Sequence, residues 1–255
     1  MFIDTHAHLY HRQFDDDRAD MVQRALDAGV TTLHLPNIDG ESIGAMHAMV
    51  EAYPEVCRMM MGLHPCSVGA DNKAALRQVE DLLGTGRYRA VGEIGIDLYW
   101  DKTHLKEQQE AFRLQVRWAK ELRLPIAIHC RNSFEEVIAI VEEEKNEHLR
   151  GVFHCFTGSA EEGRRILALD GFFLGIGGVL TFPKSGLAAT LAELGPVRCV
   201  LETDAPYLAP VPHRGKRNES AYIPLIAAEL ARATGRETAD IARITTANAI
   251  ELFGA

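Results

Sequence analysis

The sequence lacks the features of an exported or membrane-spanning protein. None of its apolar runs is long enough to cross a bilayer, which takes about 20 consecutive apolar residues. At the N-terminus the acidic Asp4 follows Met-Phe-Ile directly, without the basic region and the apolar stretch of a signal peptide. We therefore expect no membrane association.

Cysteine is scarce and shows no motif. The five cysteines form no Cys-x-x-Cys pair, and their odd number leaves one without a partner: Cys57, Cys66, Cys130, Cys155 and Cys199. Disulfide frameworks belong to oxidising compartments, whereas buried reduced thiols are typical of the cytosol. We expect reduced cysteines and a cytoplasmic location.

An excess of positive charge is also missing. The chain carries 27 Lys and Arg against 36 Asp and Glu, for a formal net charge of −9. A protein that grips long nucleic acid by neutralising many phosphates needs a basic stripe, which this composition does not supply. If the substrate is a phosphate polymer, metal ions and a few local cations must attract it, which suits work at an end or on a short segment. Nothing in the sequence indicates an obligate protein partner.

No linker, low-complexity tract or charge block divides the 255 residues, so we expect one domain over 1–255. Apolar runs that read as buried strands cover 2–8, 30–35, 57–63, 89–94, 124–129, 150–155, 171–176 and 197–203. Helical patterns cover 15–28, 40–52, 73–83, 103–122, 132–145, 159–169, 184–194, 219–234 and 237–252. This alternation predicts an α/β fold, a TIM (β/α)8-type barrel, with an open doubly wound sheet as the main rival.

Six side chains that can bind metal lie at the ends of these apolar runs. They are His6, His8, Glu93, His129, His154 and Asp204. The carboxyl ends of parallel strands meet at one edge of the sheet, where α/β folds carry their chemistry. Four histidines and two carboxylates exceed what one tetrahedral ion takes. The sequence therefore predicts two divalent metal ions, with magnesium, manganese and zinc all compatible with the donors.

Two carboxylates are the expected catalytic residues. Glu93 can bridge two cations through its two oxygens, and the glycines beside it, Gly92 and Gly95, are expected to let ions or substrate approach the backbone. Asp204 is expected to bind metal and to take a proton from the attacking water. Glu202 shares its face, deeper in the strand, and is better placed to orient a ligand. A salt-bridged Glu93 and an Asp204 that only caps a turn are the alternatives.

Four further residues are candidates for substrate binding. They are His64, Arg131, Arg214 and Lys216. His64 closes the third strand and reads as a substrate contact or proton carrier, with a purely structural histidine as the alternative. Arg131 lies two residues beyond His129, and the other two crowd the loop after the last strand. Basic side chains beside a dinuclear centre suit a phosphate, although a solvated basic loop remains the alternative.

The motifs FIDTHAHL, GLHP, GEIGID, PIAIHCR, GVFHCFTG and LETDAPYLAPVPHRGKRNE, in this order, resemble those of the TatD family of metal-dependent deoxyribonucleases. The resemblance covers the whole chain. It implies an amidohydrolase-type TIM barrel, a hydrolase acting on DNA ends, and the six ligands named above. Two positions depart from the family pattern: His213 replaces an aromatic such as Tyr, and Ser220 replaces a Pro.

Three functions are compatible with these residues. The first is a deoxyribonuclease that cleaves phosphodiester bonds at DNA ends, or in short single-stranded DNA, with a metal-activated water. The second is a metallohydrolase of a small ester, amide or lactone. The third is a barrel that only binds a partner, against which the complete set of ligands argues. The basic rim favours the first and the net acidity mildly favours the second; the native metal, the polarity of digestion and the choice between DNA and RNA stay open.

Overall fold

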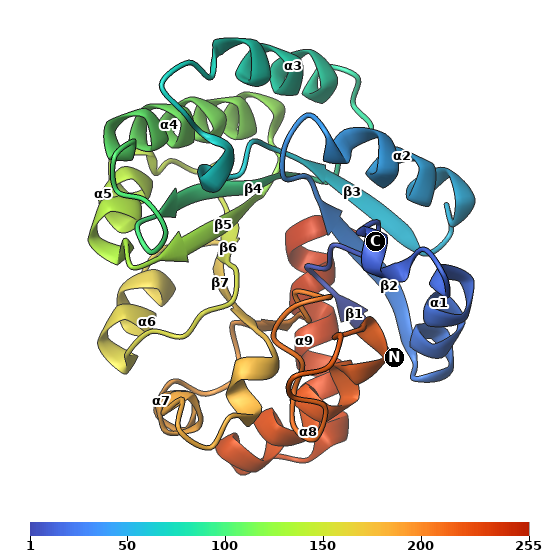
Figure 1. Cartoon of the computed structure of the whole chain (residues 1–255). Helices are drawn as coiled ribbons and strands as arrows, with labels where there is room; N and C mark the ends of the chain where they lie inside the picture. The colour runs from blue at the N-terminus through green and yellow to red at the C-terminus, as the bar shows by residue number, and fades with distance from the viewer. Residues whose placement is uncertain (255) are drawn as a thin grey trace.

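A computed structural model describes residues 1–254, which form a barrel of eight parallel strands surrounded by helices (Figure 1). The strands pair in sequence order: β1 Phe2–Asp4, β2 Val30–Pro36, β3 Cys57–Met61, β4 Ala90–Asp97, β5 Ile126–Arg131, β6 Gly151–Phe153, β7 Phe172–Ile176 and β8 Cys199–Leu201. Just beyond the strands, the N–H of Thr5 donates to the carbonyl of Leu201 at 3.0 Å and that of Asp204 to the carbonyl of His6 at 2.9 Å. The predicted barrel is confirmed. The open doubly wound sheet is wrong, because its strand order would reverse midway.

The helices are α1 Arg18–Asp27, α2 Ser42–Ala52, α3 Lys73–Leu83, α4 Leu105–Leu122, α5 Phe134–Glu144, α6 Ala160–Leu167, α7 Leu187–Leu194, α8 Ile223–Thr234 and α9 Thr238–Phe253. Helices α1 to α7 connect successive strands on the outside of the barrel, and α8 and α9 follow the last strand (Figure 1). The periodic apolar pattern located all of these helices, with differences of a few residues at their ends. Within residues 1–254, no helix combines the length and the apolar character that crossing a membrane requires.

Most strands end one or more residues away from the predicted boundary, and the differences at β1, β4 and β8 affect the candidate site most. β1 and β8 stop at Asp4 and Leu201, so His6, His8 and Asp204 lie beyond them on backbone that bonds across the closing seam. β4 continues past residue 94 to Asp97, which places Glu93 inside the strand rather than at its end. The pairing of β4 with β5 shifts register between Val91 and Ile94, and such an irregularity re-aims a side chain without ending the strand.

Apolar side chains close the amino-terminal end of the barrel. They come from seven of the strands and from the end of α9: Ile3, Met60, Ala90, Ala127, Val152, Phe173, Val200, Ala249, Leu252 and Phe253. This plug leaves the carboxyl-terminal mouth as the end where polar side chains gather, as is general for this fold.

Candidate metal centre

Glu93 is the centre of the cluster that the sequence predicted. Its carboxylate is 2% exposed, and its two oxygens face different groups of imidazoles. His129 Nδ1 lies 2.7 Å from Oε1, with His154 Nε2 at 3.9 Å from the same oxygen. His6 Nε2 and His8 Nε2 lie 3.1 and 3.5 Å from Oε2. A carboxylate with separate ligand groups at its two oxygens is arranged as a bridge between two cations.

Asp204 joins the cluster from the loop after β8. Its Oδ1 lies 3.5 Å from His8 Nε2 and 3.8 Å from His154 Nε2, and its side chain is 16% exposed. Asp204 therefore faces the same space as Glu93 but has access to solvent, which a carboxylate that exchanges protons with water needs. All six residues predicted as metal ligands lie in this one cluster.

Hydrogen bonds on the outer side of the rings set the tautomers of two histidines. The Tyr10 hydroxyl donates to the carbonyl of Pro36 at 2.6 Å, so it accepts from Nδ1–H of His8 at 2.9 Å. His129 donates from Nε2 to Asp97 Oδ2 at 2.8 Å. Each ring thus directs the lone pair of its other nitrogen toward Glu93. Outer partners of this kind orient histidine ligands in metal sites.

His64 is oriented the other way round, with its protonated nitrogen toward the cluster. Its Nδ1 accepts the backbone N–H of Cys66 at 3.0 Å, so the proton of the neutral ring is on Nε2. That nitrogen lies 3.2 Å from His129 Nδ1 and 3.4 Å from Glu93 Oε1. His64 therefore presents a donor to the cluster rather than a lone pair. This geometry favours a contact with substrate or a proton carrier over a metal ligand.

His154 and His6 complete the cluster. Their rings stack with centroids 3.5 Å apart, and His154 Nδ1 lies 3.0 Å from Glu202 Oε1, as expected if Glu202 orients this ligand. The Nδ1 atom of His6 is buried without a hydrogen-bond partner. Several buried imidazoles, not all of whose nitrogens have a hydrogen-bond partner, thus surround two carboxylates. Divalent cations such as zinc or manganese bind to this combination of ligands.

Burial and the neighbouring charges shift the pKa values of the cluster in opposite directions. Burial alone would raise the pKa of Glu93, but the imidazoles of His64, His6 and His154 hold that pKa well below its ordinary value. The pKa of Asp204 is likewise lowered by His8 and His154 despite its burial. Burial lowers the pKa of His154, yet Glu202 and Glu93 outweigh it and raise the value to about 9. Ionised carboxylates thus create a site that attracts positive charge.

A buried network beneath the cluster ties β1 to the chain after β8. Asp4 accepts hydrogen bonds from the hydroxyls of Thr203 and Ser220, each at 2.6 Å, and from the backbone N–H of Thr203 at 3.0 Å. Ser220 is one of the two departures from the family pattern, and its hydroxyl supplies a bond that proline could not. The other departure, His213, stacks on Tyr222 with ring centroids 4.1 Å apart.

The basic candidates lie on the rim, outside the buried cluster. Arg131, Arg214 and Lys216 are exposed, and the guanidinium of Arg214 lies 4.0 Å from the ring centroid of Phe182. Arg217, on the same loop, pairs with Asp17 through two bonds of 2.7 Å. Arg217 therefore fixes the loop, whereas the other three side chains remain accessible to a ligand.

Sequence reasoning missed Asp97, Tyr10 and the packing role of the glycines around Glu93. Asp97 ends β4 four residues after Glu93, and a strand boundary placed at residue 94 hid this strand-end carboxylate. A Cβ on Gly92 would lie 2.7 Å from the Cβ of Ala127, and one on Gly95 would lie 2.0 Å from the carbonyl oxygen of His129. Packing against β5 therefore requires both glycines, and their expected role in the approach of ions stays a prediction.

Asp97→Asn should weaken metal binding by about 10- to 100-fold, because the neutral amide no longer polarises His129. The change preserves shape, so folding should persist. Metal titration of the purified variant measures the loss. Asp101→Asn, an exposed carboxylate on the same loop, is the matched control. An unchanged affinity for metal would show that His129 is not a ligand.

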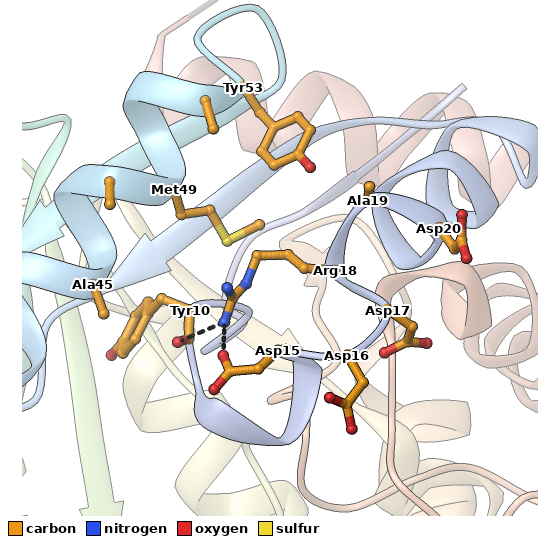
Figure 2. A pocket seen from close by; sticks show the side chains of 12 residues that line it. Tyr10, Asp15, Asp16, Asp17, Arg18, Ala19, Asp20, Ala45, Met49 and Tyr53 are labelled. Atoms are coloured by element: carbon orange, nitrogen blue, oxygen red, sulfur yellow. Dashed lines mark hydrogen bonds and ion pairs between the residues drawn. The ribbon is translucent and has the colours of Figure 1, made fainter.

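A cavity of about 500 Å³ lies apart from this cluster, between α1 and α2 (Figure 2). Four aspartates line it, and Arg18 bonds there to Asp15 at 2.7 Å and to the carbonyl of Tyr10 at 3.1 Å. The lining aspartates are Asp15, Asp16, Asp17 and Asp20. Their negative charge disfavours a phosphate, so this cavity is unsuited to a nucleic acid substrate.

An eight-stranded α/β barrel with imidazoles and carboxylates gathered at its carboxyl-terminal mouth defines the class of metal-dependent hydrolases. The family model described as TatD related DNase matches residues 3–254. The chain belongs to the TatD family, so the predicted family and enzyme class are confirmed.

The relatives are similar over almost their whole length. The uncharacterized metal-dependent hydrolase YabD of Bacillus subtilis is 37% identical and covers 99% of both chains. The 3'-5' ssDNA/RNA exonuclease TatD of Cronobacter sakazakii is 35% identical over 94% of this chain and 93% of its own. The crystal structure of YJJV, a TatD homologue from Escherichia coli K12, has a TM-score of 0.93 at 30% identity and covers 100% of this chain and 98% of that chain.

Proposed function

We propose that this protein is a nuclease that hydrolyses phosphodiester bonds at the ends of DNA or in short single-stranded DNA, using two divalent metal ions. The main support is the position of four histidines around Glu93: His6 and His8 lie near its Oε2, and His129 and His154 lie near its Oε1. His6, His8, Glu93, His129, His154 and Asp204 would hold the ions. Magnesium, manganese and zinc all suit a mixed set of imidazoles and carboxylates.

Bound divalent ions would supply charge neutralisation at phosphorus and an activated water. Asp204, ionised and partly exposed, accepts the proton that the water loses. His64 donates from Nε2 to an oxygen of the phosphate or of the leaving group, a role that its contact with Cys66 prepares. Glu202 and Asp97 hold His154 and His129 in orientation.

Nucleic acid is the substrate class best supported by the relatives and by the rim. Several relatives at 31–35% identity are named 3'-5' ssDNA/RNA exonuclease TatD. The exposed Arg131, Arg214 and Lys216 offer cations to a phosphate on the outside of the cluster. The net charge of −9 limits contact with a long duplex, which favours ends and short strands. A small ester, amide or lactone is the competing substrate, favoured only by that net acidity.

The proposal is tested with end-labelled single-stranded DNA and a panel of carbonyl esters. The purified protein is stripped of metal and assayed before and after addition of magnesium, manganese or zinc. Metal-dependent shortening of the DNA from one end is the expected result. Hydrolysis of esters with intact DNA would replace the nuclease by the small-molecule hydrolase, and no hydrolysis of either would favour a binding protein.

Arg214→Ala should reduce kcat/KM on DNA ends by about tenfold or more while leaving metal content unchanged, because a charge-assisted contact to phosphate is lost. Arg214→Lys should recover only part of the activity, because a point charge does not replace the planar fork. Steady-state assays on DNA and on any ester that the enzyme accepts measure both losses. Equal, small losses on both substrates would mean that the basic rim is only a solvated loop.

A cytoplasmic location and the absence of an obligate protein partner stay predictions. Cell fractionation tests the first. Size-exclusion chromatography of native extract, compared with the purified chain, tests the second.

A further inference from the structure

Large hydrophobic side chains are exposed preferentially at the mouth of the barrel. Of ten such side chains among residues 1–254, five lie on the loops after β4 and β8: Tyr99, Trp100, Tyr207, Leu208 and Val211. Trp100 is 73% exposed, the most of any of the ten. Single exposed apolar residues need no explanation, but a concentration beside a catalytic centre indicates a binding surface.

The aromatic pair is fixed relative to the metal centre. Asp97 Oδ1 accepts the backbone N–H groups of Tyr99 at 2.9 Å and of Trp100 at 3.4 Å. The other oxygen of the same carboxylate accepts from His129. The buried carboxylate of Asp97 therefore positions both His129 and the exposed segment of Tyr99 and Trp100. A ligand bound to these aromatic rings would lie at a fixed distance from metal ions bound at His129.

Trp100 also lines a cavity of about 290 Å³. The segment Pro65–Gly69 after β3, which follows His64 directly, also lines it, together with Asp97 and Asp101. The aspartates make this cavity unfavourable for a phosphate. The indole of Trp100, which is 73% exposed, is the apolar surface of this cavity that suits a flat uncharged ring.

Arg131 adds a cation at the edge of the aromatic pair. Its guanidinium lies 3.8 Å from the ring centroid of Tyr99 and 5.5 Å from that of Trp100. Arg131 thus occupies one face of Tyr99, while the indole remains largely exposed. This arrangement offers a stacking surface with a positive charge beside it, the combination that single-stranded nucleic acid uses.

We propose that Trp100 stacks on one nucleobase beside the scissile phosphodiester and that Arg131 contacts the adjoining phosphate. The inference rests on the proposed nuclease function and names how the strand is held. Stacking requires no positive charge and is tolerant of sequence, so it explains how a protein with a net charge of −9 retains an end of DNA. A base inside a duplex has both faces covered by its neighbours, so the site favours the unstacked bases of single-stranded ends.

The test pairs protein variants with DNA that lacks one base. Trp100→Ala, Trp100→Phe and the wild type are assayed on single-stranded oligonucleotides in which an abasic residue is placed at each position near either end. Val197→Ala, 63% exposed on the segment leading into β8, at the opposite end of the barrel, is the matched control. Trp100→Ala should lower kcat/KM on intact DNA by about tenfold or more, mainly through KM, and Trp100→Phe by much less.

The decisive result is the coupling between the two changes. At one position the abasic oligonucleotide should be cleaved equally by the wild type and by Trp100→Ala. The missing base removes the stacking partner of Trp100, so the indole no longer contributes. Equal losses at every position, or no loss in Trp100→Ala, would overturn the inference while leaving the nuclease intact. A wild type that cleaves no DNA would instead overturn the proposed function.

Binding provides a second, independent measurement. The chain has two tryptophans, Trp100 and the buried Trp118, so in a Trp118→Phe variant the tryptophan fluorescence comes from Trp100. Titration of the metal-free variant with a short oligonucleotide should quench this emission, and the oligonucleotide that is abasic at the coupled position should not. Equal quenching by both would contradict stacking.

Discussion

Glu93→Gln should lower nuclease activity by on the order of a thousandfold. The change removes the negative charge of the carboxylate that lies between the imidazoles at Oε1 and those at Oε2. The amide keeps the shape of the side chain but cannot bridge two cations through equivalent oxygens. Metal content after titration should fall from two ions per chain to one or none. Activity assays and elemental analysis of the same preparation measure both effects.

Glu144→Gln is the matched control for this change. Glu144 is also a buried glutamate, but it pairs with Arg117 and Lys120 on the outside of the barrel, both at 2.7 Å. Its replacement can cost stability, yet it should leave metal content and activity unchanged. A Glu93→Gln protein that still binds two ions and turns over normally would remove Glu93 from its bridging role.

Asp204→Asn should reduce kcat by about a hundredfold or more with much smaller loss of substrate binding. Asparagine retains one oxygen ligand and the volume of aspartate, but it cannot accept a proton from water. Steady-state kinetics on end-labelled DNA, with metal content verified in the same sample, separate the proton-transfer role from metal binding.

The pH profile provides the control for Asp204→Asn. Its neighbours lower the pKa of Asp204, so the wild-type base is ionised above that lowered value and activity is lost as the pH falls through it. The part of the acidic limb that Asp204 causes should disappear in the variant, whereas the loss of metal by protonation of the histidines should remain. Near-normal turnover with an unchanged profile would transfer the role of base to another residue, and His64 is the next candidate.

The residues of the centre could be predicted because strand periodicity is strong in a parallel barrel. Five of the eight buried runs ended at or beside a candidate ligand, and the carboxyl ends of all strands meet at one mouth, so these ligands had to lie together. The cluster around Glu93 therefore contains the six predicted ligands, although Glu93 itself lies inside β4. The helices were found for the same reason, since their apolar faces must cover the strands.

The residues that orient the ligands could not be predicted. Asp97 acts on His129 because β4 is irregular near Glu93 and continues for four further residues. The proton of His64 is set by the backbone of Cys66, which no pattern of residue types encodes. The different roles of Arg214 and Arg217 depend on whether an acidic partner such as Asp17 lies within reach, which is a property of the folded loop.

A two-ion centre organised by Glu93 can be seen by anomalous diffraction. Crystals grown without chelator and soaked in manganese are measured at the manganese absorption edge. Two anomalous peaks, each in contact with a different oxygen of Glu93, are the predicted result. A single peak at saturating manganese, or peaks that do not contact Glu93, would contradict the account.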